Sequence, residues 1–335
     1  MGCEYWPTPL ANTSELDRTV FDFRVVIANP NDVAANVRVT RAGSEAWTGA
    51  VDPHGLREIV LPWIDGQSFG LGEGSWNSIV TPGGAYRLTS DVPVIASQFN
   101  PFEYNVGSTY SYTNDATLLY PTHVLTGDYV GVSYAPLSRR TGSEGGVGGG
   151  SYSTIRYGGY VAVVGVSREP TRVEVTARGN IAGDGGGRFP PTSAGGSFAF
   201  MLQQGEVVHL AAAPPPECGP GRPGFVEQRE CETIPFFGEQ CDIFQTCKED
   251  QHDLSGTRIV ADRPVAVFGG HTCAYVPTSA QACDHLEEQL PPIQSWGRAY
   301  VSAPMGDGST SGTNIVRVMP AFESTSVTVT PPQGE

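Results

Sequence analysis

The residues best suited to chemistry lie close together late in the chain. They are His271, Cys273, Cys283, Asp284 and His285. Two histidines and two cysteines are ligand types that Zn²⁺ binds in proteins. With Glu287 or Glu288 as a general base, one hypothesis is a metal-dependent hydrolase centred on His271 and His285. The competing hypothesis is a Cys273–Cys283 disulfide bond that closes a short loop, with Asp284 capping a turn and His271 bonding backbone groups.

Four further cysteines fall between residues 218 and 247, in a segment rich in proline, glycine and charge. They are Cys218, Cys231, Cys241 and Cys247. Their gaps of twelve, nine and five residues lack the short Cys-x2–4-Cys pairs of structural zinc sites. We therefore predict two disulfide bonds, although the spacing does not choose among the three possible pairings. Disulfide bonds indicate an oxidising compartment, so we expect a secreted or cell-surface protein. Cys3 is left over.

The composition indicates which secondary structure positions these residues, and the net charge disfavours some classes of partner. The 335 residues include 42 Gly and 27 Pro, which disfavour long helices and suit many short strands joined by turns. The net charge of −15 disfavours nucleic acid and anionic membrane surfaces as partners. No run of about 18 apolar residues is present, so we expect no membrane insertion.

An internal repeat organises the chain. A β-rich run at 23–29 leads to an alternating Val/Thr run at 36–40, and the same order recurs at 160–166 with 172–176 and at 314–319 with 326–330. Alternation with β-branched residues is typical of half-buried strands, and we interpret each pair as a β-hairpin. We predict one repeat unit over 1–127, a second over 128–298 with a Cys-rich insertion at about 214–252, and the start of a truncated third unit over 299–335.

An Asp-x-Pro sequence recurs in both full units, as Asp91 with Pro93 and as Asp262 with Pro264. Aspartate can accept hydrogen bonds from nearby backbone, and proline presets φ at the start of a strand. We therefore assign these four residues to structural turns between strands.

The predicted fold class is all-β, with tandem repeats of antiparallel β-meander units. Short strands in sequence favour a propeller-like ring, and the alternative is tandem β-sandwiches. The repeat also bears on the His/Cys cluster. The first unit has Asn100 near the place of His271, has no cysteines there, and has Asp115 at the place of Asp284. A role shared by both units is structural, so we predict no catalytic residue, metal or cofactor.

Tyrosines lie beside a polar loop in the first unit. Tyr110 and Tyr112 precede Asn114, and exposed tyrosine suits contacts with protein or glycan. We assign these three residues as possible binding residues. Strand packing is the alternative interpretation of the tyrosines.

Several segments of the second unit resemble the N-terminal domain family of IgGFc-binding protein. They are 253–259, 263–273, 282–292 and Trp296-Gly297. Glu4-Tyr5-Trp6 and Phe99-Asn100-Pro101 are similar to bacterial members, notably the secreted or surface versions of myxobacteria. The resemblance implies a non-enzymatic extracellular adhesion or binding module within a larger parent protein. Antibody binding does not carry over, because no residues here match a defined antibody-contact motif.

The predicted function is thus an extracellular or cell-surface binding module, whose loops on a β scaffold contact an unidentified protein or glycan. The alternatives are the hydrolase around His271 and His285, and a purely structural spacer.

Overall fold

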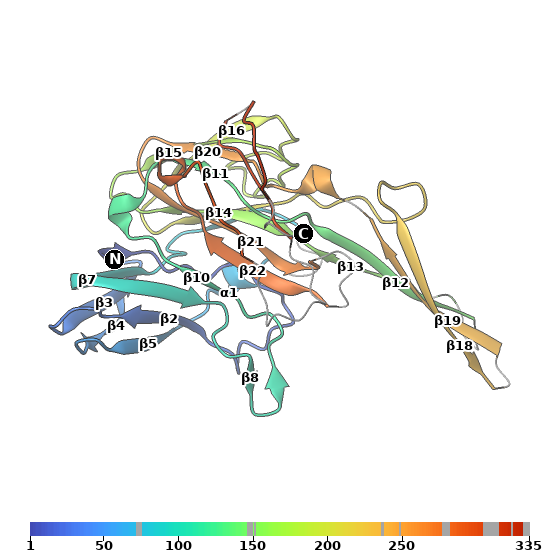
Figure 1. Ribbon diagram of the computed structural model, residues 1–335, viewed down its shortest axis with the longest axis horizontal. Coiled ribbons are helices and arrows are strands. Elements are labelled where there is room, and N and C mark those ends of the chain that lie inside the picture. The colour runs from blue at the N-terminus through green and yellow to red at the C-terminus, as the bar shows by residue number, and fades with distance from the viewer. Residues whose placement is uncertain are drawn as a thin grey trace.

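The computed structural model in Figure 1 describes residues 1–71, 76–145, 150, 152–235, 238–247, 249–276, 282–303, 315–322 and 324–330. Every strand pair in this part of the chain is antiparallel, which confirms the all-β prediction. The helical segments are single turns: α1 (Asp65–Ser68), η1 (Thr122–Val124), η2 (Asp250–His252) and η3 (Ile293–Ser295).

The first sandwich is built from the N-terminal part of the chain, and its longest strand belongs to both layers. The start of β7 lies between β1 and β3, and its end lies between β2 and β10. The two layers therefore have the orders β1-β7-β3-β4 and β10-β7-β2-β5. The strands are β1 (Gly2–Tyr5), β2 (Phe23–Ala28), β3 (Ala35–Arg41), β4 (Ser44–Val51), β5 (Leu56–Leu61), β7 (Arg87–Phe99) and β10 (Ala116–Leu118).

The second sandwich has sheets with the orders β11-β20-β15-β16 and β22-β21-β14-β17-β6. Its strands are β6 (Ile79–Thr81), β11 (Asp128–Val130), β14 (Gly159–Gly165), β15 (Thr171–Thr176), β16 (Ser197–Leu202), β17 (Val207–Ala211), β20 (Arg258–Ala261), β21 (Val265–Ala274) and β22 (Asp284–Gln289). Strand β6 comes from the first predicted repeat, yet it pairs with β17 at the edge of this second sandwich.

The two sandwiches share one strand order. The sheet β11-β20-β15-β16 corresponds strand by strand to β1-β7-β3-β4, and the strands β22-β21-β14-β17 correspond to β10-β7-β2-β5. The long strand β7 of the first sandwich is therefore replaced by two strands, β20 and β21, in the second. Val173 and Val175 of β15 share one apolar core with Val161 and Val163 of β14, so the sheets stack face to face. The chain thus forms two β-sandwiches, the alternative prediction, in place of a propeller-like ring. A ring would need each meander to stay in one sheet, whereas here the chain crosses between the two layers several times within each unit, for example from β2 to β3 and from β14 to β15.

The hairpins predicted within the repeated segments are wrong. Strand β2 pairs with β5 and β7 but not with β3, and β14 likewise does not pair with β15. Alternating apolar residues fit opposite layers of a sandwich as well as neighbouring strands of one sheet, because both bury the same faces. In the third segment, the described residues 315–319 and 326–330 form no strand, and residues 304–314 and 331–335 lie outside the described part.

The sheet that contains β14 is buried on both faces, which places it at the centre of the molecule. Tyr160, Ala162 and Val164 pack into the core of the first sandwich, whereas Val161 and Val163 face the second core. This double burial explains the uninterrupted apolar sequence of β14. The approach of β21 to the chain at Val132 requires glycine, since a Cβ on Gly269 would lie 1.7 Å from the Val132 carbonyl oxygen.

Two structures project from the sandwiches. A four-stranded arm with the order β13-β12-β19-β18 extends to the right in Figure 1, and the hairpin β8–β9 protrudes at the bottom. The arm contains β18 and β19 of the predicted Cys-rich insertion. Its strands are β12 (Leu137–Gly145), β13 (Tyr152–Tyr157), β18 (Val226–Ile234) and β19 (Gly238–Thr246), and those of the hairpin are β8 (Asn105–Val106) and β9 (Thr109–Tyr110).

Candidate functional site

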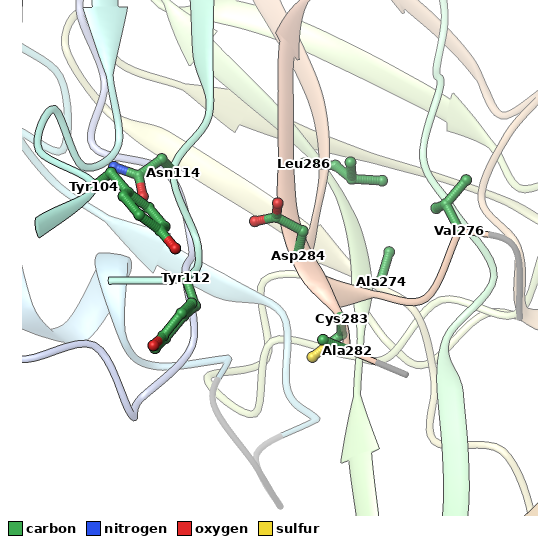
Figure 2. A pocket seen from close by; sticks show the side chains of 9 residues that line it. All are labelled: Tyr104, Tyr112, Asn114, Ala274, Val276, Ala282, Cys283, Asp284 and Leu286. Carbon is green, nitrogen blue, oxygen red and sulfur yellow. The ribbon is translucent and has the colours of Figure 1, made fainter. Parts of the chain in front are cut away.

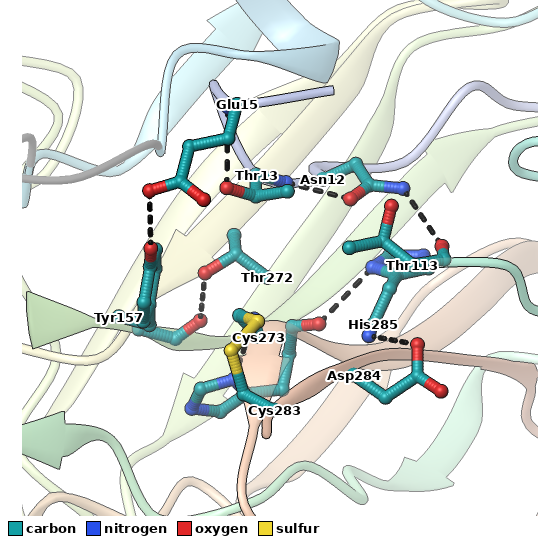
Figure 3. The surroundings of a disulfide bond; sticks show 12 residues. Asn12, Thr13, Glu15, Thr113, Tyr157, Thr272, Cys273, Cys283, Asp284 and His285 are labelled. Atoms are coloured by element: carbon teal, nitrogen blue, oxygen red, sulfur yellow. Dashed lines mark hydrogen bonds between the residues drawn. A yellow bond between two sulfur atoms is a disulfide. The ribbon is translucent and has the colours of Figure 1, made fainter. Parts of the chain in front are cut away.

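The His/Cys cluster is held together by a disulfide bond. Cys273 at the end of β21 is bonded to Cys283, just before β22, with their Cα atoms 5.1 Å apart (Figure 3). A bridged pair cannot donate two thiolates to a metal, so the arrangement does not provide the Cys2His2 zinc set considered from the sequence. The bond instead closes the connection between the neighbouring strands β21 and β22.

The two histidines are buried and engaged with backbone groups. His271 Nδ1 accepts a hydrogen bond from the Cys273 N–H at 3.0 Å, and His285 Nδ1 lies 3.1 Å from the His271 carbonyl oxygen. Burial lowers the pKa of His271 to about 3 and that of His285 to about 4. Both rings are therefore neutral near pH 7 and support the fold.

A buried polar seam joins the sandwiches beside these histidines. We define it as Gln98, Asn100, Asp115, His285 and Glu287. The Glu287 carboxyl accepts hydrogen bonds from Gln98 Nε2 at 3.3 Å and Asn100 Nδ2 at 3.1 Å, and it lies 3.6 Å from His285 Nε2. Burial raises the pKa of Glu287 well above its usual value, with Asp115 adding to the shift. The Glu287 carboxyl therefore keeps its proton to higher pH than an exposed glutamate does, and its role in the seam was not predicted from the sequence.

Asp115 and Asp284 occupy corresponding places at the starts of β10 and β22. The Asp115 carboxylate accepts from the N–H of Ala116, and the Asp284 carboxylate accepts from the N–H of His285, each at 2.8 Å. Asp91 and Asp262 also correspond: they accept from the N–H of Asn36 at 2.8 Å and of Arg172 at 2.9 Å.

Each Asp-x-Pro sequence lies where the chain passes from one layer to the other. Asp91 and Pro93 are within β7, and Asp262 and Pro264 lie between β20 and β21, which do not pair with each other. The predicted hairpin turns are therefore crossings between layers, where the aspartates bind the neighbouring strand.

The tyrosines predicted as binding residues gather on the protruding hairpin. The side chains of Tyr110 and Tyr112 are stacked with ring centroids 5.4 Å apart, and Tyr104 meets them edge-on at 5.4 and 5.9 Å. All three residues are exposed, Tyr110 at 45%, Tyr112 at 61% and Tyr104 at 56%. Tyr112 also has a φ of 51°, a left-handed conformation that is uncommon for residues other than glycine. Tyr104 is not among the binding residues predicted from the sequence, although it lies only six residues before Tyr110 and eight before Tyr112.

Asn114 holds the base of this hairpin. Its Nδ2 donates to the carbonyl oxygens of Glu103 at 2.6 Å and Pro101 at 3.3 Å, and its Oδ1 accepts from the Ser111 hydroxyl. These bonds use most of the hydrogen-bonding capacity of the amide. The structure thus places Asn114 beside the tyrosines but gives it a positioning role.

A pocket of about 480 Å³ lies between the hairpin and the end of the central sheet. Figure 2 shows Tyr104, Tyr112 and Asn114 on one side, with Asp284 and Leu286 on the other. The Asp284 carboxylate points toward the hairpin side, and the bridged Cys283 forms part of the wall. Although Asp284 is exposed, desolvation by its surroundings raises its pKa to about 6.

The remaining cysteines stabilise the arm. Cys231 is bonded to Cys241 across β18 and β19, and Cys218 is bonded to Cys247 at the base of the insertion. These bonds select one of the three pairings that the sequence left open. Cys3 is free and exposed.

Among the described residues, no helix is long and apolar enough to span a membrane. No solved structure matches the chain. The human IgGFc-binding protein is 49% identical over 49 residues, which cover 15% of this chain and 1% of the human protein. This match does not support the bacterial version that the sequence resemblance implied. The family model described as IgGFc binding protein matches residues 115–335, more than half of the chain. The chain therefore belongs to the IgGFc-binding protein family.

Proposed function

We propose that this chain is a non-enzymatic extracellular module that binds a protein ligand through the tyrosine hairpin and the adjoining pocket. The observation that carries the proposal is the cluster of Tyr104, Tyr110 and Tyr112, three exposed and mutually contacting rings beside a pocket. Tyrosine presents a large, rigid surface with a polar end, and it is enriched where proteins bind one another.

The hairpin is suited to this role because its base is anchored. Asn114 ties the segment to the carbonyl oxygens of Glu103 and Pro101, and Glu103 forms an ion pair with Arg24 of β2. An anchored base limits the conformational entropy lost when a ligand binds. The left-handed conformation of Tyr112 supports the same interpretation, since uncommon backbone conformations concentrate at binding sites.

Disulfide bonds and family membership support the extracellular setting. Three disulfide bonds are typical of proteins that fold in an oxidising environment. The sequence shows no defined antibody-contact motif, but the human relative is named for binding to the Fc part of IgG, so we propose Fc as the first protein ligand to test. The match covers 1% of that protein, and we propose that this chain too acts within a larger secreted or surface protein.

The hydrolase alternative has little support. Cys273 and Cys283 are bonded to each other, and the neutral imidazoles of His271 and His285 are buried away from the pocket surface. A buried imidazole with its pKa near 3 or 4 is a poor general base near pH 7, since it takes up a proton only at low pH.

Binding of the whole chain to immobilised human Fc tests the proposal, with the Fab fragment as control. We expect saturable binding to Fc that weakens at least about tenfold in the Tyr110→Ser/Tyr112→Ser variant. The matched control is Tyr300→Ser, which removes a tyrosine that is 76% exposed at another place.

Three results would contradict parts of the proposal. Binding that the hairpin variant leaves unchanged would exclude the hairpin as the contact site. A glycan array signal that the same variant abolishes, without Fc binding, would replace the protein ligand by a glycan. Absence of both would favour the structural spacer.

A further inference from the structure

We infer that the pocket beside the tyrosine hairpin receives an arginine or lysine side chain of the protein ligand. This inference rests on the proposed function and specifies the chemistry of the same site. It follows from the juxtaposition of exposed tyrosine rings with the Asp284 carboxylate across one pocket.

The charge lining the pocket has one sign. Asp284 is the charged residue among the nine that line it, and none of the nine is basic. In the part of the chain that the structure describes, no arginine pairs with Asp284, whose carboxylate accepts the backbone N–H of His285. A basic side chain from a partner would supply this missing counter-ion, and the net charge of −15 would attract basic surfaces.

The rings provide the second half of a cation site. Tyr104 meets Tyr110 and Tyr112 at interplanar angles of 66° and 86°, so ring faces point in different directions around the entrance. A cation over the face of an aromatic ring is attracted by the ring quadrupole. Arginine fits best, because its planar guanidinium can stack on a ring while it donates hydrogen bonds to a carboxylate.

The chain already contains this arrangement next to the site. The guanidinium of Arg24 lies 4.7 Å from the ring centroid of Phe102 and forms an ion pair with Glu103, at the base of the same hairpin. Ring, carboxylate and guanidinium are therefore compatible in this local environment. At the pocket the ring and the carboxylate are present, and the cation would come from the partner.

A sugar is a poorer fit to the same surface. Sugars require several hydrogen-bonding groups around an aromatic platform, but the Asn114 amide is bonded to the carbonyl oxygens of Glu103 and Pro101. Apart from the Asp284 carboxylate and the tyrosine hydroxyls, the lining offers few polar groups, because Ala274, Val276, Ala282 and Leu286 have apolar side chains. One carboxylate beside exposed rings matches a cation more closely than a ring of hydroxyl groups.

The test compares N-acetyl-arginine amide with N-acetyl-citrulline amide, which has nearly the same shape and no charge. Each is titrated into the whole chain while NMR follows the tyrosine ring signals. We expect saturable shifts with the arginine compound and shifts at least about fivefold weaker with citrulline. Asp284→Asn should weaken arginine binding about fivefold. Tyr112→Leu should weaken it about threefold, and Tyr112→Phe should retain it.

The control for Asp284→Asn is Asp32→Asn, which removes a carboxylate whose side chain is 96% exposed and leaves the pocket untouched. Equal response to both compounds, or arginine binding unaffected by Asp284→Asn in a folded variant, would overturn the inference. Stronger response to a methyl glycoside would assign the pocket to a sugar. Fc binding that depends on the tyrosines but not on Asp284 would overturn this inference alone and leave the proposed function intact.

Discussion

The Asp115 carboxylate and the backbone N–H of Glu287 form a 2.6 Å hydrogen bond that joins the first sandwich to the second. The Glu287 side chain lies in the seam and accepts hydrogen bonds from Gln98 of β7 and from Asn100, which directly follows that strand. Buried Glu287 and half-buried Asp115 thus meet at this junction, and desolvation raises the pKa of both.

The first prediction concerns Glu287→Gln. A carboxyl group whose pKa is raised on folding favours the folded state less as pH rises above its unfolded pKa, because folding then requires proton uptake. The amide avoids this cost, so the variant should be more stable than the wild type at pH 8, by about 1.4 kcal/mol for each unit by which the pKa is raised. The gain should vanish near pH 4. Urea unfolding at both pH values measures it.

The control for this measurement is Glu169→Gln, at an exposed position between β14 and β15, which should show no gain. A Glu287→Gln variant no more stable than the wild type at pH 8 would contradict a raised pKa for the buried Glu287 carboxyl.

The second prediction compares two disulfide bonds that close loops of equal length but differ in their distance from the pocket. Cys273–Cys283 and Cys231–Cys241 each join residues ten positions apart, so loss of either should lower the free energy of unfolding by a similar amount, about 2 to 3 kcal/mol. Only the former borders the pocket. Replacing both cysteines of each pair by alanine should therefore weaken Fc binding for 273/283 and leave it unchanged for 231/241. Equal binding loss in the two variants would argue against the pocket as part of the contact site.

The third prediction is the pH dependence of arginine binding at the pocket. The pKa of Asp284 is raised to about 6, so its carboxyl takes up a proton as pH falls through that value and no longer attracts a cation. Affinity for N-acetyl-arginine amide should fall between pH 7 and pH 5. The Asp284→Asn variant should bind with a flat profile over this range. A fall of equal size in the variant would assign the titration to another group.

The fourth prediction concerns the crossings between layers. Removing the acceptor at Asp262 leaves the N–H of Arg172 without its 2.9 Å bond, so Asp262→Ala should cost about 1 kcal/mol of stability. Asp262→Asn keeps an oxygen acceptor and should cost less. The same pair of substitutions at Asp91, which bonds the N–H of Asn36, should give the same order. Thermal unfolding of the four variants checks this, and an asparagine as harmful as alanine would contradict the acceptor role.

Much of the fold could be predicted because the sequence repeats its strands. Alternation at 36–40 and 172–176 identified β3 and β15, and Asp91 and Asp262 marked equivalent places in both units. The layer to which each strand belongs could not be predicted, because alternation specifies which face is buried and not which strand is the neighbour. This is why the sequence of β2 and β3 predicts a hairpin, whereas the two strands lie in opposite layers.

The residues of the proposed site could be foreseen only in part, for a different reason. Tyr110, Tyr112 and Asn114 are close in sequence, so the sequence alone predicts that they lie near one another in the fold. Asp284 lies far from them along the chain, and the pocket exists because the hairpin of the first sandwich reaches the end of β21 and β22. The seam likewise depends on tertiary packing, since Glu287 meets Gln98 and Asn100 of the other sandwich.

Hydrogen–deuterium exchange of the whole chain with and without human Fc tests the central claim most directly. The account predicts that protection on binding concentrates in the hairpin at 104–112 and in residues 282–286 across the pocket. Protection confined to the arm strands β18 and β19, or no protection anywhere at saturating Fc, would contradict it.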